Sequence, residues 1–250
     1  MTQRPVAFVW DNFGPLHVDR CEAAARQIGP RTPVIGIEIF AGSDDYDWQQ
    51  PEARGFRKQT LFADGNWKSR PPTKVSAAIV DAVINANCKA AFLSHYDQPA
   101  MLLAAIRLRR AGVQIFTMGC SKYDDAKRHL AREWLKRFFY RPYDGGIGSD
   151  YRSTAYMRRL GLPADRVLGG YNTVNQDRIR ALAARAAPDN KAFGQRPFLV
   201  VARLIWEKNF PGLLKAYAQY CRSIDTPRRL QIAGSGPLDD ELRALARELD

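Results

Sequence analysis

The sequence predicts an α/β fold of two domains, each built on a parallel sheet, with the second domain incomplete. Short apolar runs rich in Val, Ile and Phe alternate with segments of helical period, which is the pattern of β–α units that pair in parallel. The alternation is interrupted at residues 187–197 (APDNKAFGQRP), where Pro, Gly and polar residues collect as they do in inter-domain linkers. The predicted domains are therefore residues 1–186 and 198–250.

Residues 1–186 contain most of the expected elements. Strands are expected at Val6–Trp10, Val34–Phe40, Thr60–Phe62, Ala90–Leu93, Val113–Met118, Gly145–Gly148 and Arg166–Gly169. Helices are expected near Val18–Ile28, after an N-cap at Thr73, from Pro99 to Gly112, over Asp124–Arg141 and from Asp150 to Gly161. In the helix over Asp124–Arg141, Leu130, Trp134 and Phe138 share one face and basic residues surround it, so much of the positive charge lies there.

Residues 198–250 contain fewer elements. They are a strand at Phe198–Ala202, a helix with Leu213, Leu214, Tyr217 and Cys221 inward, a strand at Leu230–Ala233 and a helix that ends near Leu249. Two such units do not make a stable doubly wound sheet, because each inner strand needs a neighbour on both sides and helices over both faces. We therefore expect this domain to be truncated.

The composition is that of an ordinary globular protein, with 46% hydrophobic and 26% charged residues, and it excludes disordered, collagenous and coiled-coil chains. An excess of 38 Lys and Arg over 26 Asp and Glu gives a formal charge of +12. Such a charge favours an anionic partner, namely a phosphorylated small molecule, an acidic membrane face or nucleic acid. Nucleic acid fits least, because the basic residues are spread over helices without an aromatic-lined groove or a helix-turn-helix pattern.

The cysteines and the N-terminal segment indicate the cellular compartment of the protein. The four cysteines stand singly, with no C-x-x-C pair and no zinc-site spacing, which is typical of reduced, mostly buried thiols. The N-terminus lacks the apolar core of a signal peptide, and no apolar run approaches the ~20 residues of a membrane span. These features predict a cytoplasmic protein, and the basic helix leaves open a peripheral contact with membrane.

The strongest chemical signal is VVARLIWEKNFP, residues 200–211. A strand ends at Arg203, Lys208 follows five residues later, and a helix then begins. Parallel sheets bind ligands outside the carboxyl ends of their strands, and a helix N-terminus at that place favours an anion, so the two cations could clamp a diphosphate. The structural alternative is a pair of surface cations neutralised by Glu207.

The next unit, LQIAGSGPLDDEL at residues 230–242, repeats this order with a Gly-rich turn between strand and helix. Alone, the turn requires only the freedom of Gly to adopt positive φ. Together, the two motifs resemble the start of the C-terminal domain of nucleotide-sugar glycosyltransferases with two Rossmann-like domains, the GT-B fold, and in particular their retaining family four (glycosyl transferases group 1). The resemblance implies that Gly234, Gly236 and Pro237 bind the donor and that Arg203 and Lys208 are catalytic.

The resemblance extends into the first domain, which in this family faces the acceptor. RVLGGYNTVNQDRI (residues 166–179) is similar to the crossing between the domains, with Asn172 where the family commonly has Asn, so the resemblance implies that Asn172 also contributes to donor binding. VWDNFGPLHVDRCEAAAR (residues 9–26) is similar to the first strand, the donor-facing loop and the first helix. The family's Gly-Gly pair is replaced here, which leaves Gly14 as the residue implied to approach the donor phosphates, and residues 41–70 match no family segment.

The family also has a glutamate motif, two Glu separated by seven residues, that binds the donor sugar and ribose. No such motif precedes Asp250. We therefore expect the 250-residue chain to be a truncated enzyme that is inactive by itself.

Two histidines are candidates for the substrate cleft. His95 follows the strand Ala90–Leu93, where family members often have a His that reaches the transferred sugar, so the resemblance implies a catalytic role for it. His17 opens the first helix and is expected to face the acceptor. His129 lies among basic residues and is expected to be solvated.

The triplet Asp45-Tyr46-Asp47 matches the D-x-D of metal-dependent glycosyltransferases of the other major fold. It lies in a polar loop rather than at a strand end, and Arg203 with Lys208 would already balance the charge of a leaving diphosphate. We therefore expect neither an obligatory metal nor a cofactor. Asp11 and Asp97, the other acids near strand ends, receive no catalytic role.

The resemblance implies transfer of a sugar from a nucleotide-diphosphate sugar to an acceptor hydroxyl with retention of configuration. Catalysis would be electrostatic, with no protein nucleophile. The acceptor would be a sugar, a glycan or a lipid-linked molecule. The alternatives are a nucleotide-sugar epimerase, an inactive GT-B relative and, less favoured, a basic nucleic-acid-binding protein.

Overall fold

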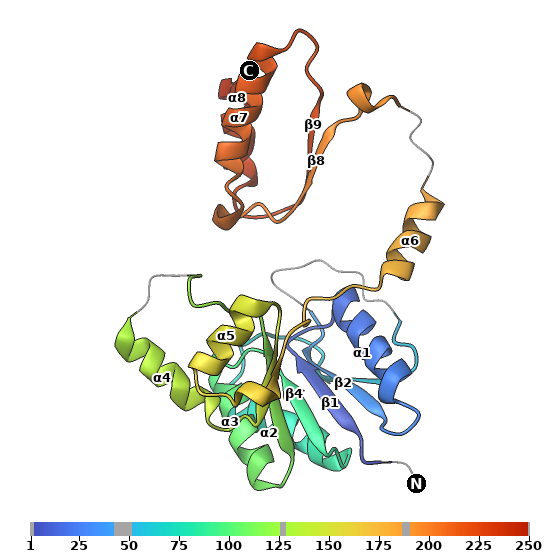
Figure 1. The fold of residues 1–250 in the computed structure, drawn as a ribbon, viewed down its shortest axis with the longest axis vertical. Helices are drawn as coiled ribbons and strands as arrows, with labels where there is room; N and C mark the ends of the chain where they lie inside the picture. The colour runs from blue at the N-terminus through green and yellow to red at the C-terminus, as the bar shows by residue number, and fades with distance from the viewer. Residues whose placement is uncertain (1–2, 43–51, 126–128, 187–190, 250) are drawn as a thin grey trace. The chain divides into compact units, whose positions relative to one another are not determined.

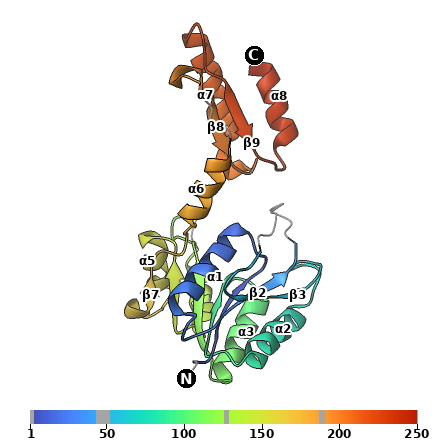
Figure 2. The same cartoon turned by 90° about the vertical axis from the view of Figure 1, so that its right-hand side faces the viewer.

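The computed structural model of the chain describes residues 3–42, 52–125, 129–186 and 191–249. It divides into two compact units, residues 1–181 and 182–250, each with its own parallel sheet (Figures 1 and 2). The division falls within helix α6 (Gln176–Arg185), ahead of the predicted linker at 187–197, of which residues 191–197 are described.

The first unit contains a seven-stranded sheet in the order β3-β2-β1-β4-β5-β6-β7, with every neighbouring pair parallel. Its strands are β1 (Val6–Trp10), β2 (Val34–Phe40), β3 (Arg57–Phe62), β4 (Ala90–Leu93), β5 (Gln114–Gly119), β6 (Gly145–Gly148) and β7 (Val167–Leu168). This confirms the predicted sheet. The chain reverses its direction of progress across the sheet between β1 and β4, and such a switch point is where open α/β sheets bind ligands.

The helices of the first unit are α1 (Pro15–Ile28), α2 (Pro72–Asn85), α3 (Pro99–Arg110), α4 (Leu130–Tyr140), α5 (Tyr151–Arg159) and the start of α6, with a 3-10 turn η1 (Ala164–Arg166). One core lies between the sheet and α2, α3 and α5, and a second lies between the sheet and α1. Both faces of the sheet are therefore covered, as a parallel sheet requires (Figure 2).

Two predicted helix starts are wrong. The N-cap of α2 is Pro71 rather than Thr73, because Pro72 fits the first helical turn without needing its missing N–H. The helix predicted over Asp124–Arg141 begins only at Leu130 among the described residues, which exclude 126–128. Asp124 lies in a turn, and the Asp125 carboxylate accepts the backbone N–H of Lys122 at 2.7 Å, an interaction that favours a turn over a helix.

The second unit consists of two parallel strands, β8 (Phe198–Val201) and β9 (Leu230–Ala233), with helices α7 (Phe210–Ser223) and α8 (Asp239–Leu249) on one side (Figure 1). The short 3-10 turn η2 (Phe193–Gln195) precedes β8, and a second one, η3 (Trp206–Lys208), lies between β8 and α7. The core of this unit is small, with Leu204, Phe210, Leu214 and Leu242 buried and Leu213 half-buried beside them. Leu199 and Val201 on β8 are exposed.

Two further sequence expectations concern burial and membranes. Cys21 and Cys88 are buried as predicted, whereas Cys120, just after β5, is exposed and Cys221, near the end of α7, is half-buried. None of the helices in the described ranges combines the length and the hydropathy that a membrane span needs. The cytoplasmic location stays a prediction.

Candidate functional site

The carboxyl ends of β1 and β4 bring Asp11 and His95 together. The Oδ1 atom of Asp11 lies 3.1 Å from Nε2 of His95, although the sequence analysis gave Asp11 no role. Ser94 ties the end of β4 to β1, since its N–H and its hydroxyl both donate to the carbonyl of Val9, at 3.1 and 3.0 Å. His95 has a φ of 52°, in the left-handed region that side chains other than Gly seldom adopt, which indicates that its surroundings impose its position.

Charge and burial oppose each other in this pair. Burial disfavours both charged forms, and therefore acts to lower the pKa of His95 and to raise that of Asp11. The hydrogen bond and the opposite charge of the partner outweigh it, so the pKa of His95 lies above its usual value and the pKa of Asp11 lies below it. Asp97 raises the pKa of His95 further, and the Asn12 N–H, 2.9 Å from Asp11 Oδ1, stabilises the carboxylate. His95 is thus predisposed to carry a proton.

The pKa of His17 is shifted in the opposite direction from that of His95. Burial, followed by the positive charge of Arg20, lowers the pKa of His17 to about 4, so its imidazole is neutral at pH 7. Its Nδ1 accepts the N–H of Gly14 at 3.0 Å, which places the imidazole proton on Nε2. Its ring centroid lies 4.8 Å from that of Trp10. The edge of this sheet therefore holds one imidazole that binds a proton readily and one that does not.

Gly14 is the N-cap of α1. Its carbonyl accepts the N–H groups of His17 and Val18, and its own N–H is donated to the His17 side chain. The structure therefore places Gly14 at the start of a helix on the site edge, with its N–H engaged by His17. Its predicted contact with donor phosphates stays a prediction.

A buried carboxylate holds the loop between β1 and α1. Glu38, on β2, is fully buried, and its Oε1 accepts the N–H of Phe13 at 2.8 Å. Its Oε2 accepts the hydroxyl of Thr60 at 2.7 Å and lies 2.9 Å from the ammonium of Lys58. A buried pair of this kind fixes an arrangement more than it adds net stability. Glu38 was not among the residues predicted for the site, although an acid inside the apolar run VIGIEIF is a signal that indicates it.

Asn172 also lies at α1. Its Oδ1 is 3.4 Å from the guanidinium of Arg20, which in turn lies 4.3 Å from the ring centroid of Tyr171. The Tyr171 hydroxyl accepts the indole N–H of Trp10 at 2.7 Å. These contacts connect the segment after β7 to the end of β1, and they place Asn172 beside α1, the helix that carries His17.

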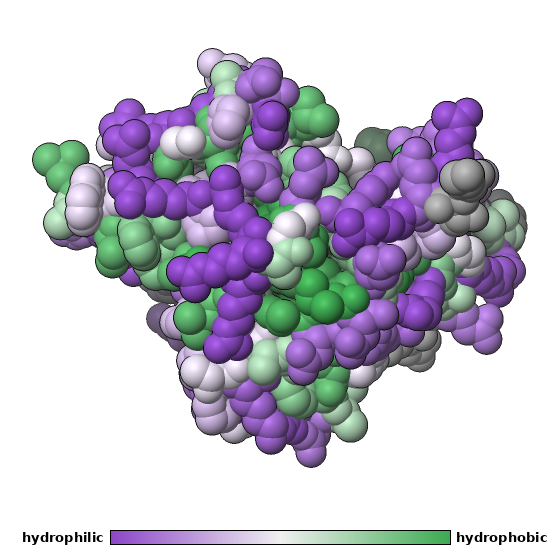
Figure 3. All heavy atoms as spheres, turned by 90° about the horizontal axis from the view of Figure 1, so that it is seen from below, coloured by the Kyte–Doolittle hydropathy of each residue, from purple (hydrophilic) through white to green (hydrophobic). Residues whose placement is uncertain are grey.

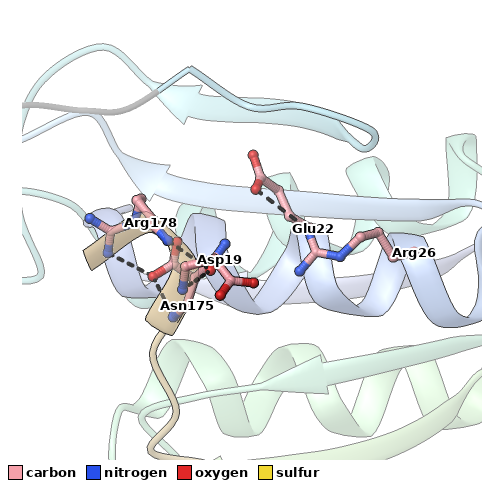
Figure 4. Close-up of polar contacts among 6 residues, drawn as sticks. Asp19, Glu22, Arg26, Asn175 and Arg178 are labelled. Atoms are coloured by element: carbon pink, nitrogen blue, oxygen red, sulfur yellow. Dashed lines mark hydrogen bonds and ion pairs between the residues drawn. The ribbon is translucent and has the colours of Figure 1, made fainter. Parts of the chain in front are cut away.

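A second set of contacts ties the beginning of α6 to α1. Asp19 is buried on α1, and Arg178 donates to its two carboxylate oxygens at 2.8 and 2.7 Å. The Asn175 N–H donates to the same carboxylate at 3.1 Å, while the Glu22–Arg26 pair lies further along α1 (Figure 4). These contacts with Asp19 could not be predicted from the sequence, because their partners are 156–159 residues apart.

In the second unit, the loop after β8 lies against the turn after β9. Leu204 donates its N–H to the Ser235 carbonyl at 2.9 Å and accepts the Leu238 N–H at 3.2 Å. A Cβ on Gly234 would lie 1.9 Å from the carbonyl oxygen of Ala202, and one on Gly236, whose φ is 157°, would lie 2.5 Å from that of Leu204. Both glycines are therefore required by the close approach of the two loops, which brings the turn with Pro237 beside the loop of Arg203.

The two predicted cations differ in exposure. Arg203 is half-buried, and Lys208 is exposed at the end of η3, next to Asn209, which has a φ of 49° and caps α7. The first turn of α8 carries three acids, Asp239, Asp240 and Glu241, whereas the first turn of α7 carries none. Since acids near a helix N-terminus already compensate its positive end, the N-terminus of α7 beside Lys208 suits an anion better than that of α8.

Each unit thus gathers its own share of the predicted site residues. Gly14, His17, His95 and Asn172 lie at the carboxyl edge of the first sheet, and Arg203, Lys208, Gly234, Gly236 and Pro237 lie at that edge of the second. His129 is exposed ahead of α4, as expected. Asp45-Tyr46-Asp47 lies outside the described residues.

No protein-family model and no curated protein matches the sequence. Solved structures do match the fold. HepE from Anabaena, in complex with UDP and glucose, is 12% identical, with a TM-score of 0.60 over 99% of this chain and 66% of that chain. The UDP-N-acetylglucosamine 2-epimerase from Rickettsia bellii is 15% identical, with a TM-score of 0.57 over 99% and 66%. The lipopolysaccharide outer core galactosyltransferase WaaB is 15% identical, with a TM-score of 0.56 over 98% and 65%.

These neighbours are nucleotide-sugar enzymes built from Rossmann-like domains. The chain has the GT-B fold. It spans about two thirds of the length of these three solved chains, 65–66% of each. At 12–15% identity the likeness is one of fold, and the fold alone does not specify the reaction.

Proposed function

We propose that the protein transfers a sugar from a nucleotide-diphosphate sugar to an acceptor hydroxyl, with retention of configuration. The observation that carries this proposal is the contact between the two loops of the second unit, where backbone hydrogen bonds join Leu204 to Ser235 and Leu238. They place the Arg203–Lys208 loop beside a Gly-rich turn at the carboxyl ends of two parallel strands, where α/β sheets bind phosphates. The fold shared with glycosyltransferases supports it.

In this proposal the donor diphosphate binds to the second unit. As the bond between the sugar carbon and the phosphate oxygen breaks, negative charge grows on the diphosphate, and hydrogen bonds from Arg203 and Lys208 strengthen. The acceptor oxygen bonds to the same carbon on the face that the diphosphate leaves, and the acceptor proton passes to the leaving phosphate oxygen. Two cations offset the developing charge, so the reaction requires neither a metal nor a protein nucleophile.

His95 would orient the transferred sugar. Asp11 binds Nε2 of His95. Within the described residues, Nδ1 of His95 makes no hydrogen bond to another group. Because the imidazole is half-exposed and its pKa is raised, Nδ1–H is a suitable donor to a sugar hydroxyl. Asp11 is then a positioning residue that holds the ring and its proton. His17, neutral at pH 7, would face the acceptor.

A nucleotide-sugar epimerase is the second candidate. The observation that favours it is the same Asp11–His95 pair, because an imidazole held by a carboxylate can also move a proton to or from a sugar carbon. The fold shared with UDP-N-acetylglucosamine 2-epimerase is compatible with it. The two reactions differ in whether an acceptor is consumed.

The test is an assay of the full-length protein with UDP-, GDP- and ADP-sugars, with and without an acceptor sugar. Acceptor-dependent release of nucleoside diphosphate, unchanged by a chelator, and a product with the donor's anomeric configuration by NMR are the expected results. Inversion at a sugar carbon without an acceptor would identify the epimerase instead. If none of these nucleotides binds in a calorimetric titration, the donor site is misplaced.

A further inference from the structure

Helix α4 presents its largest apolar side chains to solvent. Leu130 is 85% exposed and Trp134 is 72% exposed, and Leu135 and Phe138 are exposed beside them. These residues share one side of the helix. Soluble proteins seldom expose a contiguous apolar patch that has no binding role. Leu130, Trp134 and Phe138 lie on one face of the helix, as predicted, and the structure shows that this face is exposed to solvent.

The opposite side of α4 fixes this orientation with polar contacts. Lys136 lies 3.0 Å from the hydroxyl of Tyr156 and 3.1 Å from Glu133, and the Tyr156 hydroxyl donates to Glu133 at 2.7 Å. Tyr156, on α5, is buried. The helix is therefore attached to the unit through this charged pair and through Phe139 and Tyr140, which pack on the first core, while the four exposed apolar residues point outward. An ordinary surface helix has one apolar side, which packs on the core, whereas α4 has a second apolar side that is exposed to solvent.

Arginines surround the apolar residues. Two adjoining hollows of about 530 and 520 Å³ share Trp134, Arg137 and Leu160, and Arg141 and Arg159 also line them. The guanidinium of Arg141 lies 5.6 Å from the ring centroid of Phe138. Helix α4 lies at the left of Figure 1. The left side of Figure 3, which shows the molecule from below, has hydrophobic residues among long hydrophilic side chains.

We propose that this α4 surface, formed by Leu130, Trp134, Leu135 and Phe138 with Arg137, Arg141 and Arg159 around them, docks on an acidic lipid bilayer. An outward face of Trp, Phe and Leu flanked by arginines is the composition of helices that lie in a membrane interface. The arginines match anionic head groups, and the apolar side chains match the acyl boundary below them.

Other occupants fit this surface less well. A second copy of the chain would bring the same arginines against one another, and like charges across an interface oppose association. An acidic peptide would pair with the arginines but would leave the exposed apolar side chains without a matching partner. Docking on a bilayer requires no sugar donor, so the proposal stands independently of the proposed transfer.

Co-sedimentation of the protein with vesicles tests the proposal. We expect binding to phosphatidylcholine vesicles that contain about 30% phosphatidylglycerol, weakened by salt, and little binding to phosphatidylcholine alone. The Trp134→Ser/Phe138→Ser and Arg137→Gln/Arg141→Gln variants should each bind the acidic vesicles about tenfold more weakly or worse. All four side chains are exposed, so circular dichroism should show unchanged folding.

Matched controls lie in the second unit. Trp206→Ser removes a tryptophan that is 77% exposed, and Arg222→Gln/Arg247→Gln removes the same charge from exposed positions. Both should bind like the original protein. The proposal is wrong if the protein does not bind acidic vesicles, or if the α4 variants bind as well as the controls. It is also wrong if light scattering without vesicles shows a dimer that Trp134→Ser/Phe138→Ser dissociates, since the surface would then join two copies.

Discussion

The proton affinity of His95 depends on a single neighbour. Asp11→Asn removes the negative charge and the charge-assisted hydrogen bond that raise the pKa of His95, while the burial that lowers it stays. The pKa of His95 should therefore fall in this variant. NMR titration of the imidazole protons measures it directly, because the chain has only three histidines.

His17 is the internal reference for this titration. Its pKa of about 4 means that its signals should not shift between pH 6 and 8 in either protein. An unchanged pKa of His95 in Asp11→Asn would contradict the pairing.

The same pair predicts a pH dependence of stability. His95 has a folded pKa above its ordinary value of 6.5, so its contribution is complete below that pH and is lost as pH rises through the raised pKa. Asp11 has a folded pKa below 3.8, so its contribution is present above that value and is lost as pH falls through the lowered pKa. Asp11→Asn should therefore destabilise the protein most near pH 5, and least above the raised pKa of His95. Urea unfolding at a series of pH values measures this, and an effect that grows toward high pH would contradict it.

Lys208 should matter for turnover and not for folding. Each charge-assisted hydrogen bond to a phosphate oxygen contributes about 1.5–3 kcal/mol, so Lys208→Ala should lower turnover by roughly ten- to a hundredfold. Stability should barely change, because Lys208 is exposed. Lys215→Ala is a matched control, since it removes an exposed lysine from α7. Intact turnover with a lowered melting temperature in Lys208→Ala would mean that Lys208 is structural.

Between the elements, the close contact of the loops after β8 and β9 depends on Gly234. A Cβ there would lie 1.9 Å from the backbone oxygen of Ala202, which directly follows β8 and cannot move without displacing that strand. Gly234→Ala should therefore destabilise the second unit by about 1–3 kcal/mol and weaken nucleotide-sugar binding. Thermal unfolding and calorimetric titration of the full-length protein measure the two effects.

Gly194→Ala is the control for this substitution. No atom lies within 4 Å of where its Cβ would be, so its stability should change little. Equal effects of the two substitutions would show that the loops do not pack as described.

At the scale of the whole molecule, the two units differ in how much apolar surface they bury. The first unit has a core on each face of a seven-stranded sheet, whereas the second buries four residues against one side of two strands. Local stability follows buried apolar contacts, so in the 250-residue chain the amides of β8 and β9 should exchange with solvent at least about tenfold faster than those of β1 and β4. Hydrogen-exchange mass spectrometry measures this by segment, and equal protection of both sheets would contradict it.

The sequence by itself determined the strands, the order of β–α units and the Gly-rich turn, because these depend on neighbours a few residues apart. Val6–Trp10, Val34–Phe40 and Ala90–Leu93 have the predicted bounds, since apolar runs bounded by polar loops identify buried strands. Helix starts were less predictable where proline replaced a side-chain cap, as in α2.

Only the tertiary structure decided which side chains meet and which way each face points. Asp11 and His95 are 84 positions apart, and neither position alone indicates that sheet pairing makes them an ion pair with shifted pKa values. Glu38 and Phe13 are joined in the same way, across β1 and β2. In α4 the helical period showed which residues share a face, but the contacts with Tyr156 and the packing of Phe139 and Tyr140 on the core turn that face outward. Periodicity is local, whereas burial and proton affinity depend on groups that are distant in the chain and brought close by the fold.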